Sequence, residues 1–254
     1  MSPTPAGVCP DRALEILYAD EALVAVMKPA GLLVHRTELA SAATEFAVQR
    51  LRDQIGRPVF PAHRLDRATS GVLLFALDPA VHARLCAAFE AGAVRKRYLA
   101  IVRGWPPASL EIDHPLRRLD GDGTARRDAA PLAAHTQMVS LATAELAVRV
   151  DRYPTSRYAL VALTPRTGRR HQLRRHLKHI DHPIIGDTTY GQGRHNRLFR
   201  ERFGCMRLLL HAAALTLAHP LSGAPLAIVA PAPRDFESVA AALGIGAAGF
   251  EEPA

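Results

Sequence analysis

Residues 63–104, HRLDRATSGVLLFALDPAVHARLCAAFEAGAVRKRYLAIVRG, predict a polar loop, a strand, a helix and a second strand in direct succession. The apolar run at residues 72–77 is typical of a buried strand. Asp78 before a proline is typical of a helix start, and apolar residues then recur every four positions up to the stop at Gly92. The segment that follows, residues 95–104, alternates as a strand does.

The same criteria predict further elements on both sides of this stretch. Strands are expected at residues 14–18, 23–28, 136–149, 158–163, 208–217 and 226–230, and helices at 44–55, 169–180 and 235–243. Because strand and helix do not alternate regularly and no repeat of fixed period occurs, a doubly wound parallel fold is disfavoured. We predict an α+β fold with a mixed or mostly antiparallel central sheet and flanking helices.

The predicted boundaries give a single catalytic domain of two lobes at residues 14–243. It is preceded by a leader at residues 1–13, rich in proline, and followed by a tail at residues 244–254. The segment at residues 119–131 is rich in Gly, Asp and Arg and is expected to be a loop.

Composition narrows the class of partner. The chain has 254 residues, 48% of them hydrophobic, and its formal charge of +8 favours a polyanion such as RNA, DNA or an anionic membrane. No apolar stretch reaches the roughly 20 residues that a bilayer-spanning helix needs, and the first residues lack the apolar region of a signal peptide. The three cysteines form no CxxC motif, so we expect neither disulfides nor a thiolate zinc site. Cysteines without disulfides fit a reducing compartment, so we expect a cytoplasmic location.

Asp66 is the first candidate for chemistry, because it lies between Arg64 and Arg67. Nearby positive charge keeps a carboxylate ionised. A salt-bridged surface turn is the alternative interpretation. A functional interpretation therefore needs a second element.

Residues 166–178, RTGRRHQLRRHLK, supply that element with six basic residues and no acid. On a helix Arg170, Arg174 and Lys178 would follow one flank. Such a flank meets phosphates, points one arginine toward a carboxylate, or is a solvated basic face.

Other chemistries lack their signatures. The histidines at 171, 176, 179 and 182 do not form the i, i+4 pair of helical zinc motifs, and arginines crowd them. The Gly-rich loops of phosphoryl-transfer and dinucleotide enzymes and the GxSxG of esterases do not occur. We therefore expect no metal and no organic cofactor. Tyr98 is either an ordinary strand aromatic or a ring on which an extruded base stacks.

Taken in order, the motifs resemble the RluA family of pseudouridine synthases, from about residue 14 to 231. They are KPAGLLVH, HRLDRATSG, RKRYLAIVRG, TGRRHQLRRHL, HPIIGDTTYG and LLLHAAALTLAHP. The resemblance implies the pseudouridine synthase fold with a basic active-site cleft, and isomerisation of uridine to pseudouridine in RNA without a cofactor.

The resemblance also implies residue roles. Asp66 would be the catalytic carboxylate, acting as a nucleophile at ribose C1′ or uracil C6, or as a base at C2′. Arg174 would pair with Asp66, and Tyr98 would stack on the flipped base and help to remove the C5 proton. Arg64 would fill the space that the base leaves. The expected substrate-binding residues are His63, Arg64, Arg67, Thr69, Lys96, Arg169, Arg175 and Lys178.

Longer segments, at residues 32–40, 50–71 and 151–187, are similar to family members that modify the uridine at position 65 of tRNA. The expected partner is RNA, specifically tRNA, with no membrane and no protein partner, and the protein is expected to be a monomer. The alternatives are another tRNA or ribosomal RNA uridine, a noncatalytic RNA-binding module on the same scaffold, and a metal-dependent nuclease.

Overall fold

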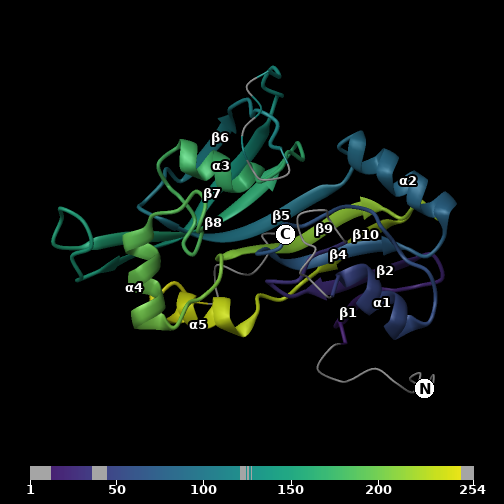
Figure 1. Cartoon of the computed structure of the whole chain (residues 1–254), viewed down its shortest axis with the longest axis horizontal. Helices are drawn as coiled ribbons and strands as arrows, with labels where there is room; N and C mark the ends of the chain where they lie inside the picture. The colour runs from purple at the N-terminus through teal and green to yellow at the C-terminus, as the bar shows by residue number, and fades with distance from the viewer. Residues whose placement is uncertain (1–12, 36–44, 121–123, 125, 127, 247–254) are drawn as a thin grey trace. The chain divides into compact units, whose positions relative to one another are not determined.

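The computed structural model describes residues 13–35, 45–120, 124, 126 and 128–246. The chain divides into two compact units. Figure 1 shows the helices and strands of the chain, most of them labelled. Within the described residues, unit 1 contains residues 13–95 and 214–230, and unit 2 contains residues 96–213 and 231–246.

Unit 1 is built on antiparallel strand pairs. Its strands are β1 (Ile16–Ala19), β2 (Leu23–Lys28), β3 (Phe60–Pro61), β4 (Ser70–Ala76) and β10 (Pro225–Val229), with the last part of β9 (Leu210–Ala218). β2 pairs with β1 and β4, β3 pairs with β4, and β10 pairs with β9, all antiparallel. Every residue of β4 is buried, as its apolar sequence predicts.

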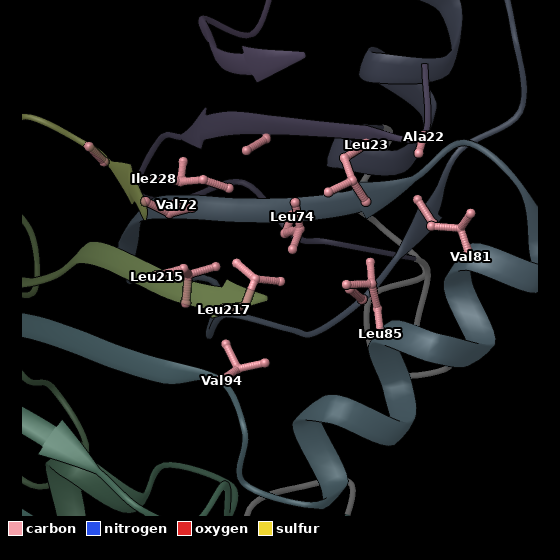
Figure 2. Close-up of a cluster of buried hydrophobic side chains, with 14 residues drawn as sticks. Ala22, Leu23, Val72, Leu74, Val81, Leu85, Val94, Leu215, Leu217 and Ile228 are labelled. Atoms are coloured by element: carbon pink, nitrogen blue, oxygen red, sulfur yellow. The ribbon is translucent and has the colours of Figure 1, made fainter. Parts of the chain in front are cut away.

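Two helices complete unit 1. α1 (Ala47–Ile55) ends at Gly56 with a left-handed φ of 70°, and α2 (Pro79–Glu90) begins after Asp78, whose side chain accepts the N–H groups of Ala80 and Val81. Val81 and Leu85 of α2 point toward the apolar side chains of β2, β4 and β9 (Figure 2). This cluster is the core of unit 1.

Unit 2 has its own antiparallel strands, β5 (Arg95–Arg103) apart from its first residue, β6 (Ser109–Asp113), β7 (His135–Leu146) and β8 (Ser156–Pro165), with the first part of β9. β8 pairs with β5 and β7, and β7 pairs with β6. Its helices are α3 (Gln172–His179), α4 (Gly193–Phe203) and α5 (Arg234–Ala242). A second core forms from β5, β8, α4 and α5, with Tyr158, Phe199 and Phe236 fully buried.

The predicted α+β class is confirmed, and most predicted elements occur within a few residues of their expected bounds. Three elements were not predicted, namely β3, β6 and α4. The helix expected at residues 169–180 begins at Gln172, so Arg170 lies outside it. The predicted shared flank of Arg170, Arg174 and Lys178 is therefore wrong, and Arg174 is buried whereas Lys178 is exposed.

Other predictions fall partly outside the described residues. The first 12 residues of the leader and the last eight of the tail lie there, so the domain bounds stay a prediction. In the loop at residues 119–131, the backbone of Asp120 bonds to that of Thr124, and a bridge between Leu116 and Leu132 closes its base. None of the described helices is long and apolar enough to cross a bilayer. Cys86 and Cys205 are free thiols.

Candidate active site

The HRLD loop of unit 1, residues 63–71, is held by the loop that follows β2. Lys28 is fully buried, and its ammonium donates to the carbonyls of Pro29 and Leu32 at 2.8 Å each and of Arg67 at 3.3 Å. The Gly31 N–H donates to the Arg67 carbonyl at 2.7 Å, and Arg67 Nε donates back to the Gly31 carbonyl at 3.0 Å. A buried ammonium requires such acceptors, so Lys28 and Gly31 fix the backbone immediately after Asp66.

Asp66 itself is half-buried in this loop. Its carbonyl accepts the N–H of Thr69 at 3.0 Å and closes a turn, and the Thr69 side chain is buried. Leu65, which precedes Asp66, is buried as well, whereas Arg64 is exposed. The buried side chains of Leu65 and Thr69, on either side of Asp66, thus anchor the loop in unit 1 and support the carboxylate.

His63 contributes to this support. Its Nε2 accepts the backbone N–H of Leu74 at 3.1 Å, and its ring stacks on Phe89 of α2 with centroids 5.0 Å apart. These two contacts fix the orientation of the imidazole ring. The structure places His63 in the fold of the loop, and its expected contact with substrate stays a prediction.

Arg174 lies on the buried face of α3 in unit 2 and forms a bidentate ion pair with Asp187. Its Nε donates to Asp187 Oδ2 at 2.7 Å and its Nη2 to Oδ1 at 2.9 Å, and the two side chains are only 8% and 1% exposed. Its guanidinium also lies 5.0 Å from the ring centre of Tyr190. The family resemblance implied Asp66 as the partner of Arg174, and that pairing stays a prediction.

Asp187 is the functional candidate that the sequence did not single out. Its Oδ1 also accepts the N–H groups of Thr189 and Tyr190 at 2.9 Å each. Burial alone would raise the pKa of this carboxyl, but the hydrogen bond and charge of Arg174, with those N–H groups, lower it below its ordinary value. The ion pair is therefore permanent at neutral pH and orients Arg174.

The backbone before Asp187 requires a glycine. Gly186 has a φ of +80°, and a Cβ there would lie 1.8 Å from the carbonyl oxygen of Arg207. Asn196 of α4 braces the same turn, accepting from Gly186 N–H at 2.8 Å and donating to the Asp187 carbonyl at 2.9 Å. The motif HPIIGDTTYG could have revealed Asp187, because a buried arginine needs a nearby acid.

Tyr98 and Lys96 lie on β5. Tyr98 is half-buried and opposite Leu163 of β8. Lys96 donates to the carbonyl of Thr167 at 3.4 Å, and burial lowers its pKa. β5 and the start of the arginine motif of unit 2, residues 167–177, are therefore in contact through this lysine.

The remaining basic candidates of unit 2 contact backbone carbonyls or solvent. Arg169 Nε donates to the Ala133 carbonyl at 3.1 Å, and Arg175 Nη1 donates to the Arg117 carbonyl at 2.9 Å. Burial lowers the pKa of Arg175. Lys178 is exposed. Their expected contacts with RNA stay predictions.

The model of the family described as RNA pseudouridylate synthase matches residues 22–179, which include the HRLD loop, β5 and α3. The chain belongs to this family. Its members isomerise uridine in RNA, so the protein is an RNA pseudouridine synthase. The resemblance to the RluA family is thus confirmed, and four of the six motifs lie within the matched residues.

Relatives and solved structures support the same family. The chain is 55% identical to tRNA pseudouridine synthase C of Salmonella typhimurium over 220 residues, covering 85% of each chain. It is 51% identical to tRNA pseudouridine synthase C of Vibrio cholerae over 218 residues, covering 85% of this chain and 89% of the relative. Human RNA Pseudouridylate Synthase Domain Containing 1 has 27% identity and a TM-score of 0.69, covering 89% of this chain and 86% of its own. Human RNA Pseudouridylate Synthase Domain Containing 4 has 29% identity and a TM-score of 0.67, and the match covers 91% of this chain and 93% of the human chain.

Proposed function

We propose that this enzyme converts the uridine at position 65 of tRNA to pseudouridine, with Asp66 as the catalytic carboxylate and without a metal or organic cofactor. The support for tRNA is the 55% and 51% identity to enzymes named tRNA pseudouridine synthase C. The support for Asp66 is its half-buried position in a loop that Lys28 and Gly31 hold rigidly. Because the fold already holds the carboxylate in place, no reorganisation of Asp66 is needed when the reaction occurs.

The proposed reaction conserves every atom of the nucleoside. The N1–C1′ bond breaks, the uracil turns, a C5–C1′ bond forms, and the proton of C5 leaves while N1 gains one. Asp66 attacks C1′ or C6, or removes the C2′ proton, and each route requires the ionised carboxylate. Because no electrons enter or leave and no water is consumed, the reaction needs no redox cofactor.

Other residues have proposed roles around this step. The target base must first leave its stack, at a cost of a few kcal/mol that contacts in the site offset. Arg64 fills the vacated space, Tyr98 stacks on the extruded ring and helps to remove the C5 proton, and Arg174 keeps Asp66 charged. Asp187 holds Arg174 in place through the ion pair.

A mapping experiment tests the proposal. Purified protein is incubated with unmodified tRNA and ribosomal RNA transcripts, and pseudouridine is located by carbodiimide-induced stops of reverse transcription. We expect one stop, at position 65 of tRNA, that persists with EDTA and disappears with Asp66→Asn. The matched control is Asp53→Asn, an exposed carboxylate of α1 in the same unit, which should leave the stop unchanged.

Each alternative has its own outcome. Stops in ribosomal RNA alone would overturn the tRNA assignment. Full activity of Asp66→Asn would remove the role of that residue, and RNA binding without any stop would indicate a noncatalytic module. RNA cleavage that EDTA abolishes would indicate a nuclease.

A further inference from the structure

Unit 2 carries an exposed group of arginines and aromatic rings that the proposed reaction does not use. We call it the hairpin patch. It contains Arg149, Arg152, Tyr153 and Arg157 from the turn between β7 and β8 and its edges, Trp105 after β5, and Arg194 at the start of α4, all of them exposed.

The hairpin patch contains two arginine–aromatic pairs. Arg152 Cζ lies 4.7 Å from the ring centre of Tyr153, and Arg157 Cζ lies 4.2 Å from that of Trp105. Tyr153 and Trp105 are 57% and 41% exposed, and Trp105 Nε1 donates to the Ala144 carbonyl at 3.0 Å, which fixes its ring. Flat rings and guanidinium planes open to solvent are the surfaces on which nucleic acid bases stack.

The turn that carries the patch is anchored from within. Burial raises the pKa of Tyr158 to about 12, so its hydroxyl stays protonated, and it forms a hydrogen bond of 2.8 Å with His195 Nδ1. His195 Nε2 lies 3.0 Å from Asp151 Oδ2 and 3.2 Å from Arg103 Nε, and Arg103 Nη2 lies 3.5 Å from the same carboxylate oxygen. Arg149 Nε donates to the Asp151 carbonyl at 3.1 Å. The turn is therefore preorganised, which lowers the entropic cost of binding.

The local charge is positive. Asp151 and Glu145 are the acids that contact arginines of the patch, at Arg194 and Arg157 respectively. Arg149 contacts a backbone carbonyl and Arg152 contacts an aromatic ring. Neither partner carries a negative charge, so both arginines keep their positive charge uncompensated by these contacts. Positive charge beside exposed rings fits a polyanion that also offers bases.

We propose that the hairpin patch binds a stretch of the substrate RNA other than the uridine that reacts. Arg149, Arg152 and Arg194 contact phosphates, and the rings of Tyr153 and Trp105 stack on unpaired bases. The inference rests on the RNA substrate that family membership gives, and not on which uridine is modified.

The test compares the affinity of variants for a full-length unmodified tRNA transcript and for a short oligonucleotide that keeps the target uridine. The charge variant is Arg149→Ala/Arg152→Ala. Its control is Arg200→Ala/Arg202→Ala, which removes two exposed arginines from the last turn of α4. The ring variant is Tyr153→Ala, with Tyr153→Phe as its control. Thermal unfolding checks that all variants fold as the wild type does.

We expect the charge variant to raise Kd for the transcript about tenfold and to reduce the slope of log K against log salt by about 1.5, the value for two lost phosphate contacts. Tyr153→Ala should raise Kd by about fivefold or more without changing that slope, because base stacking carries no charge. The affinity for the oligonucleotide and the turnover at saturating RNA should not change, and both controls should behave as wild type.

Two results would overturn the inference. The first is that the charge and ring variants bind the transcript with the same Kd and the same salt slope as their controls. The other is an equal loss of affinity for transcript and oligonucleotide. If the enzyme modifies an RNA other than tRNA, the proposed substrate fails separately, and the same comparison with that RNA decides the role of the patch.

Discussion

Asp187 and Arg174 form a buried ion pair whose two hydrogen bonds, at 2.7 and 2.9 Å, are short and charge-assisted. Burial of a lone charge is costly, and a bidentate partner offsets much of that cost. The pair therefore depends on both members at once, and removal of either charge leaves the other buried and uncompensated.

Asp187→Asn should lower the free energy of unfolding by roughly 3 kcal/mol. The control is Glu111→Gln, which breaks the ion pair of Glu111 with Arg166, two side chains that are 54% and 66% exposed. An exposed pair contributes less than about 1 kcal/mol, so this control should be close to wild type. Urea unfolding at pH 7 measures both, and equal stabilities of the two variants would contradict the structural importance of Asp187.

At the scale of elements, the helices differ in how much of their position comes from local sequence. α2 has a capping aspartate, a first-turn proline and apolar residues at four-residue spacing, and it was predicted closely. α4, with the sequence GRHNRLFRERF, was not predicted because charged residues interrupt its apolar face. It is held by burial of His195 and Phe199, and these contacts come from distant parts of unit 2.

The cap of α2 gives an element-scale prediction. Asp78→Ala removes the acceptor of the Ala80 N–H, which bonds to Asp78 at 2.7 Å. The free energy of unfolding should fall by about 1 kcal/mol. Asp78→Asn keeps a side-chain oxygen and should stay within a few tenths of a kcal/mol of wild type. Thermal denaturation compares the three proteins, and a full loss in the Asn variant would show that charge and not capping is responsible.

At the scale of the whole molecule, pH acts on stability through buried histidines. His176 is fully buried, with Nδ1 3.0 Å from the hydroxyl of Thr136 and Nε2 3.0 Å from the carbonyl of His114. Burial, together with the charges of His114, His179 and Arg175, lowers its pKa from 6.5 to about 4. The folded protein therefore keeps His176 neutral at pH values where the unfolded chain protonates it.

Because the unfolded chain binds the proton first, stability should fall as the pH drops from about 6.5 toward 4, by at most about 1.4 kcal/mol per pH unit for this group. His176→Gln should be less stable than wild type at pH 8, but the difference should shrink on acidification because glutamine does not titrate. Urea unfolding at pH 8, 6.5 and 5 measures the difference. A constant difference across this range would contradict the assignment to His176.

Local patterns in the sequence determined most of the strands and helices, the α2 cap and the position of the HRLD loop, because alternation, capping and turn formation depend on residues a few positions apart. The tertiary structure alone decided that Asp187 binds Arg174, that Lys28 is buried against the carbonyl of Arg67, and that Trp105 lies beside Arg157. These partners are separated by 13 to 52 residues in the chain. The packing of strands and helices decides which arginine lies next to which acid. The spacing of two residues along the sequence does not give the distance between them in space.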